Sequence, residues 1–105
     1  MIPTIKRIPE SLFWEWSGLM RNSMKLMKIT QQNLADACMT SRQTISYMLN
    51  KPTCRPTGLQ FLGTTLALAQ LAAESDKDLD LIDRVLQKID DCNRHYFNKV
   101  REEIA

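Results

Sequence analysis

Apolar residues recur every three or four positions along most of this chain, a spacing that predicts amphipathic helices. The segment before the first such stretch, about residues 1–10, contains two prolines and predicts an extended N-terminal arm. The first helix is predicted from about Glu10 to Lys28. Its inward face is formed by Leu12, Phe13, Trp16, Leu19, Met20, Ser23 and Leu26/Met27.

Two short helices are predicted next, each behind a residue that can cap it. Thr30 and Ser41 both carry a hydroxyl that can accept a hydrogen bond from a free N–H group of a first helical turn. We therefore expect helices from about Gln31 to Cys38 and from about Ser41 to Leu49. The side chains expected to point inward are Leu34, Ala35, Cys38, Ile45 and Met48.

A proline-bracketed loop separates these helices from two longer ones, because the residue before a proline avoids helical geometry. The fourth helix is predicted from about Thr57 to Ala73, where Gly63 would permit close helix packing. After a polar break, one long helix is predicted over residues 79–104. The apolar face expected for the fourth helix consists of Leu59, Leu62, Leu66 and Ala69.

The last helix has an apolar stripe that must be covered, because a single amphipathic helix is not stable alone in water. It either folds back on the other four helices or pairs with a second copy of the chain. We favour pairing, since the stripe is long for a small domain that already has its own core. The expected dimer interface is Ile82, Leu86, Ile89, Tyr96 and Val100.

Composition supports an all-α protein of five helices: 105 residues, 44% hydrophobic, with only three glycines and four prolines. No apolar run approaches the roughly 20 residues of a membrane span, and the start lacks the features of a signal peptide. The three cysteines are widely spaced, which favours neither a disulfide framework nor a metal site. We therefore expect a cytoplasmic protein without metal, cofactor or membrane contact.

Charge is distributed unevenly along the chain, although the formal net charge is only +2. Residues 1–72 hold eight basic and three acidic side chains, whereas residues 73–105 hold six basic and nine acidic ones. A basic front and an acidic rear suit a module whose front meets a polyanion, although ordinary scatter on a small protein is the alternative.

The segment from about Ile29 to Asn50 predicts a helix-turn-helix. Ala35 is small enough for the second helix to approach the first, and Ile45 can fill the angle between them. The stretches TQQNLADA, SRQTIS and RPTGL are similar to the lambda-repressor/Cro family of helix-turn-helix regulators, over about residues 12–73. Where that family has glycine in the turn, this chain has Met39. A left-handed non-glycine residue costs on the order of 1 kcal/mol, so we expect a different turn or a strained one.

The resemblance implies that the second helix of the motif enters the major groove of DNA. Arginine can form two hydrogen bonds to guanine, and glutamine two to adenine. Tyr47 could instead pack on its own helix or on a partner. The residues expected to contact bases are Ser41, Arg42, Gln43, Ser46 and Tyr47.

Contacts to the DNA backbone are expected around this helix. The resemblance places Gln31 at a phosphate, and Lys51 and Arg55 follow the recognition helix in sequence, although both are equally well explained as ordinary surface charges. The full set of expected phosphate contacts is Thr30, Gln31, Lys51, Arg55 and Thr57.

Together these features predict a dimeric, sequence-specific regulator of transcription, such as a repressor of bacterial, phage or mobile-element origin, that reads paired half-sites in double-stranded DNA. The alternative is a protein-interaction module, such as an antitoxin or inhibitor, on the same scaffold; Trp14 or the last helix could be its docking surface. An enzyme is not expected, because the chain has no His/Cys/Asp constellation, glycine-rich phosphate loop or metal-ligand spacing.

Overall fold

The computed structural model describes residues 6–75 and 78–104. The five predicted α-helices are all present in these ranges. Each helix begins and ends within two residues of its expected bounds. No strand is present in the described ranges, apart from one isolated pair of bridged residues. The elements are α1 (Glu10–Met27), α2 (Gln31–Ala37), α3 (Arg42–Asn50), the short 3₁₀ helix η2 (Pro52–Cys54), α4 (Gly58–Ala73) and α5 (Leu79–Ile104).

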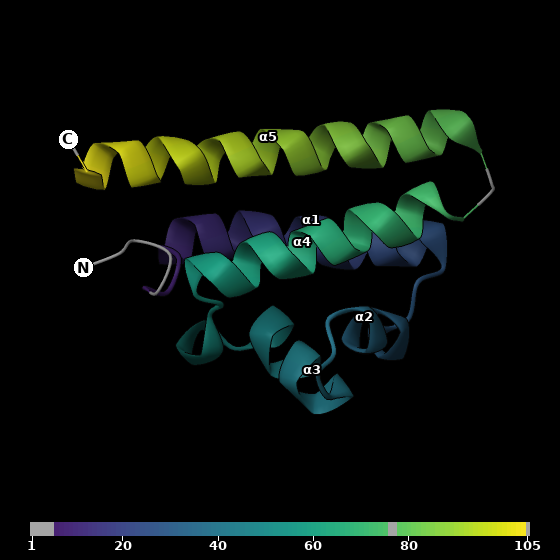
Figure 1. The fold of residues 1–105 in the computed structure, drawn as a ribbon, viewed down its shortest axis with the longest axis horizontal. Coiled ribbons are helices and arrows are strands. Elements are labelled where there is room, and N and C mark those ends of the chain that lie inside the picture. Colours follow the sequence, from purple (N-terminus) through teal and green to yellow (C-terminus); the bar gives the residue numbers. More distant parts are fainter. Residues whose placement is uncertain (1–5, 76–77, 105) are drawn as a thin grey trace.

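The helices form three layers (Figure 1). Helices α1 and α4 lie in the middle, α5 runs along one side of them, and α2 and α3 lie on the other side. Consequently α3 and α5 are on opposite sides of the molecule. No helix in the described part of the chain has both the length and the apolarity required to cross a membrane.

The core joins the middle layer to α5 through aromatic side chains. Trp16, Phe13 and Phe61 are fully buried, and the Phe61 ring centroid lies 6.0 Å from that of Trp16 and 4.9 Å from that of Tyr96. The indole N–H of Trp16 donates to the Thr65 hydroxyl at 3.0 Å, and that hydroxyl donates to the Phe61 carbonyl at 2.6 Å. One continuous core therefore unites α1, α4 and α5.

The apolar stripe of α5 faces this core, so the prediction that it forms a dimer interface is wrong. Leu86 and Val100 are partly buried against the core of the same chain, and the other three members are buried in it. The fold-back alternative is the one observed, because α1 and α4 present an apolar surface that α5 alone covers. The buried members of the predicted interface are Ile82, Ile89 and Tyr96.

The face predicted to be buried in α4 is also wrong. Leu59 is 67% exposed and Leu66 63% exposed, while Leu62 and Ala69 are only partly buried. The helix is apolar on both sides, and the side that carries Thr65 is turned inward. The residues that α4 buries are Gly58, Phe61, Thr64, Thr65, Ala67, Leu68 and Ala72.

The described part of the predicted N-terminal arm is fixed to the loop before α4. Arg7 and Thr57 form an antiparallel bridge, the Ile8 amide donates to the Pro56 carbonyl at 2.9 Å, and the Gly58 amide donates to the Lys6 carbonyl at 2.9 Å. Ile8 is fully buried. Residues 6–9 are therefore part of the domain, and residues 1–5 of the predicted arm lie outside the described residues.

Candidate nucleic-acid interface

The turn between α2 and α3 contains a strained residue. Met39 has a φ of 55°, in the left-handed region. Its amide donates to the Asp36 carbonyl at 3.2 Å, and the Thr40 amide donates to the Ala35 carbonyl at 3.0 Å. These two hydrogen bonds form a Schellman motif, which satisfies carbonyls at the end of α2. Of the two outcomes expected for this turn, the chain therefore adopts the strained one.

The inner side of α3 is firmly anchored. Ile45 of α3 is fully buried and belongs to the same core cluster as Leu34 and Ala35 of α2. The buried Ser17 hydroxyl donates to the Leu49 carbonyl at 2.6 Å, which ties the end of α3 to α1. A helix that is fixed in this way presents its outer face in a defined orientation.

Ser41 caps α3, as predicted. Its hydroxyl accepts a hydrogen bond from the Thr44 amide at 3.1 Å and lies 2.8 Å from the Thr44 hydroxyl. Capping of this kind stabilises a helix by about 1 kcal/mol. Since α3 has only nine residues, this cap keeps its first turn, which carries Arg42 and Gln43, in helical geometry.

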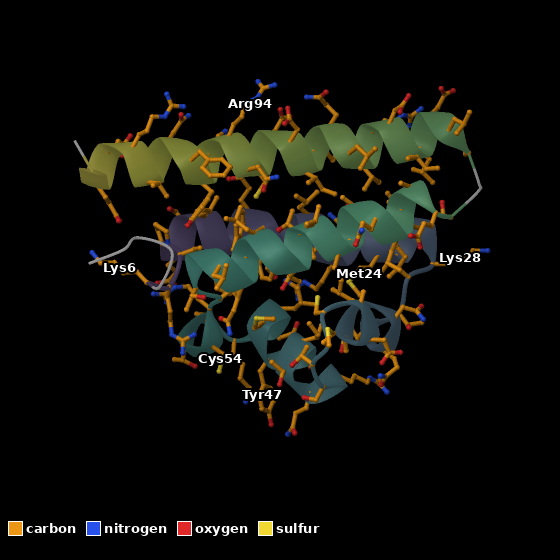
Figure 2. All side chains as sticks on the ribbon, in the orientation of Figure 1. Lys6, Met24, Lys28, Tyr47, Cys54 and Arg94 are labelled. Carbon is orange, nitrogen blue, oxygen red and sulfur yellow. The ribbon has the colours of Figure 1, made fainter. Side chains whose placement is uncertain are left out.

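The outer face of α3 carries polar side chains, and some of these side chains contact one another. The Gln43 amide donates to the Tyr47 hydroxyl at 2.7 Å, and the Lys51 ammonium lies 4.1 Å from the centroid of the Tyr47 ring. In Figure 2, Tyr47 points away from the body of the molecule, on the side opposite Arg94 of α5. Tyr47 therefore does not pack into the core but belongs to an exposed row with Gln43 and Lys51.

Arg42 lies at the start of this row, and its side chain is the least constrained by neighbouring residues. It is exposed and forms no hydrogen bond or ion pair with any residue in the described ranges. Ser46 is half-buried, and its carbonyl accepts a hydrogen bond from the Asn50 side chain at 2.8 Å. The structure thus brings all five predicted base-contacting residues to α3 and its cap, with Ser46 the least exposed.

Thr30 and Gln31 lie at the start of α2, but Thr30 has a structural role. Its hydroxyl accepts from the Asn33 amide at 3.0 Å, and its own amide donates to the Asn33 side chain at 3.1 Å. This reciprocal pair is a capping box. Gln31 is half-buried next to it.

Arg55 and Thr57, predicted to contact phosphates, each have a structural role within the described residues. The Arg55 side chain donates to the carbonyls of Ile8 and Pro52, both at 2.8 Å, and the Arg55 carbonyl accepts from the Arg7 guanidinium. The Thr57 hydroxyl accepts from the Gln60 amide at 3.3 Å, in a second capping box. The Ile8 partner of Arg55 is 47 positions away, so spacing alone did not indicate that contact, whereas the cap at Thr57 joins residues three positions apart.

Sequence reasoning missed one residue beside α3, Arg21 of α1. The Arg21 guanidinium of α1 donates to the Asn50 side chain at 3.1 Å, which brings a cation to the C-terminal end of α3. Arg21 is exposed and 29 positions away in sequence. Its only available signal was its place on the polar side of the α1 pattern.

The two sides of the molecule differ modestly in charge, and Asp36 is the one acidic side chain of α2 and α3. No Asp or Glu occurs from residue 37 to residue 73, a range that holds Arg42, Lys51 and Arg55. Helix α5, on the other side, carries six acidic and five basic side chains. The side that presents α3 is therefore the one suited to a polyanion.

Two of the three thiols, those of Cys38 and Cys92, are not activated as nucleophiles. Burial raises the pKa of Cys38, and burial together with the Glu15 carboxylate raises the pKa of Cys92 to about 12. Thiols of raised pKa are largely protonated at neutral pH and are poor nucleophiles. Within the described residues, no three His, Cys, Asp or Glu side chains are grouped in a way that could hold a metal ion.

Comparisons with protein-family models, with curated proteins and with solved structures find no match to this chain. Its function is therefore inferred from its own residues.

Proposed function

We propose that the chain is a sequence-specific DNA-binding regulator of transcription, built like the lambda-repressor/Cro family that residues 12–73 resemble. Helix α3 lies in the major groove of DNA, where Arg42 and Gln43 bind base edges. Ser41, Ser46 and Tyr47 flank them.

The observation that carries this proposal is the outer face of α3. Helix α3 is short and capped, it is tied to α1 on its inner side by a hydrogen bond, and it carries no acidic side chain. The major groove is about 12 Å wide and admits a single helix. Arg42 and Gln43 are the residue types that form paired hydrogen bonds with guanine and adenine.

The test is selection of bound sequences from random double-stranded DNA, followed by affinity measurement on the selected site. We expect one preferred motif and affinity that falls steeply with salt. The variant Arg42→Ala/Gln43→Ala should lose roughly 1–3 kcal/mol of discrimination for each lost bidentate contact.

A matched control lies on the opposite side of the molecule. Arg84 and Gln87 of α5 are exposed, and Arg84→Ala/Gln87→Ala removes the same two residue types. This variant should bind the selected site like the unchanged protein. Equal losses in both variants, or no selected motif, would show that α3 does not read DNA.

Lys51 is proposed to position the protein on the DNA backbone and not to determine which sequence is bound. Its ammonium lies over the Tyr47 ring, next to the base-reading row. Lys51→Ala should weaken binding about equally for all sequences and reduce the slope of log affinity against log salt by about 1. A change in the preferred sequence would contradict this role.

The protein-interaction alternative is supported by one observation, Trp14, which is 49% exposed on α1. An exposed tryptophan is typical of protein contacts. Copurification of one stoichiometric partner protein, lost in Trp14→Ala but retained in Arg42→Ala/Gln43→Ala, would establish it.

A further inference from the structure

The outer face of α4 is uncharged and largely apolar, and its exposed polar side chains are those of Gln60 and Gln70. Leu59 and Leu66, two turns apart, are the most exposed leucines of the helix, and Gly63 lies between them on the same face. The whole helix from Gly58 to Ala73 contains no charged residue. A solvated helix face usually carries charged residues, so this uncharged face with two exposed leucines is built differently from the outer face of α5.

Gly63 has no role within the chain. A Cβ atom placed on it would meet nothing within 4 Å among the described residues. Glycine in a helix interior is less stable than alanine, so its use here costs stability without improving any contact of α4 with α1, α2 or α5. Glycine in an exposed helix does allow another helix to approach its backbone closely.

Met39, which lies beside this face, is likewise an unfavourable residue within the chain. It is 94% exposed, although it occupies a left-handed position that a methionine adopts only with strain. Gly63 and Met39 both line one open groove of about 510 Å³ between the α2–α3 turn and α4. Two features that are unfavourable within the chain therefore lie on one continuous surface. The remaining residues along the groove are Ala37, Cys38, Thr40, Thr44, Met48, Gln60 and Thr64.

We propose that this surface binds a second copy of the chain, with the two α4 helices packed antiparallel across a twofold axis at Gly63. Leu59 of each copy then contacts the partner's Leu66, and the missing side chain at Gly63 lets the backbones approach. Met39 closes the interface at the groove.

Charge and symmetry favour a second copy as the occupant. In a twofold interface the same patch faces itself, so any charged group near the axis would meet its own copy. This patch has no such group, whereas the outer face of α5 carries Asp83, Asp90 and Asp91. With few exposed leucines the interface is small, so self-association should be weak and dependent on concentration.

The consequence for DNA, which rests on the proposed function, is cooperative binding. A twofold axis through α4 relates two copies of α3, as paired half-sites in an inverted repeat require. Binding to one half-site raises the local concentration of the second copy, so a weak interface suffices.

The decisive variant is Gly63→Ala, because it should stabilise the folded chain but weaken its self-association. It should raise the Tm of the chain at low concentration by about 4 °C, since alanine favours the helix and has room. It should weaken self-association at least roughly ten-fold, since the new methyl groups separate the helices. Sedimentation velocity without DNA measures the association.

Gly18→Ala is the matched control. Gly18 lies in α1, and a Cβ atom there would likewise meet nothing within 4 Å. This variant should raise the Tm similarly and leave self-association unchanged. If the chain remains monomeric at roughly millimolar concentration, or if Gly63→Ala associates as strongly as Gly18→Ala, the proposal is overturned.

A charge exchange tests the antiparallel arrangement. Leu66→Glu should weaken self-association, and adding Leu59→Lys in the same chain should restore it, because each new ammonium then faces a carboxylate of the partner. Failure of the double variant to recover would overturn the antiparallel packing. All these measurements omit DNA, so a chain that associates but binds no DNA contradicts only the proposed function. A chain that binds one half-site but never associates contradicts only the α4 interface.

Discussion

Helices α4 and α5 both carry apolar residues at helical spacing, yet they use them in opposite ways. In α5 the stripe packs on the core and the outer face is charged. In α4 two leucines of the most regular apolar row face solvent, while the inner face combines Phe61 and Leu68 with buried threonines. The comparison teaches that periodicity identifies an apolar stripe but not its partner.

Hydroxyl groups explain the orientation of α4. Thr65 is nearly fully buried because its hydroxyl satisfies both the Trp16 indole and the Phe61 carbonyl. Burial of a polar group is unfavourable unless it is hydrogen-bonded, and here the partners exist only in the folded chain. Helix α5 has no competing apolar face, so its stripe had only one orientation available.

Removal of α5 should have the largest effect on stability. A chain ending at Ser75 would expose the faces of α1 and α4 that α5 covers. Five buried side chains would be lost, each worth about 1.5–3 kcal/mol, which is comparable with the whole stability of a small domain. We expect no cooperative thermal transition by circular dichroism. A cooperative transition would instead make α5 an appended element. The five side chains are Ile82, Val85, Ile89, Cys92 and Tyr96.

The two faces of α4 can be compared directly. Phe61→Ala should lower the free energy of unfolding by about 3–5 kcal/mol, because Phe61 is fully buried among aromatic rings. Leu59→Ala, on the exposed face, should change it by less than about 0.5 kcal/mol in dilute solution. Urea denaturation measures both. Similar losses would mean that the two faces of α4 are not distinct.

Thr65→Val tests why α4 has this orientation. The substitution keeps the shape but leaves the buried Trp16 indole N–H without an acceptor, which should cost about 1–3 kcal/mol. The exposed Thr53→Val is the control, with an expected change under about 0.5 kcal/mol. If Thr65→Val is as stable as the unchanged chain, apolar packing alone orients the helix.

Cys92, on the buried face of α5, should affect the pH dependence of stability only at high pH. Its pKa is raised from the ordinary value of 9.0 to about 12 by burial and by the Glu15 carboxylate. Between these values the unfolded chain releases the thiol proton and the folded chain retains it, so stability falls as pH rises from 9 to 12. Cys92→Ala should reduce this fall, measured as urea midpoints against pH. Cys54→Ala, for which no such burial applies, should leave the fall as it is; equal behaviour of both variants would contradict the assignment.

Much of the candidate interface could be predicted from sequence. The caps at Thr30 and Ser41 and the exposed side chains of Arg42 and Gln43 follow from interactions within one or two turns of helix. Arg55 could not be assigned in this way, because the groups it binds include the Ile8 carbonyl, 47 positions away.

The sequence by itself determined the number, order and bounds of the helices, since capping and periodicity act over three or four residues. Only the tertiary structure decided that α5 covers its own chain and that α4 turns its leucines outward. Those choices depend on contacts such as Trp16 with Thr65, 49 positions apart, and Glu15 with His95, 80 apart. Local spacing carries no information about such partners, because they come together only when all five helices share one core.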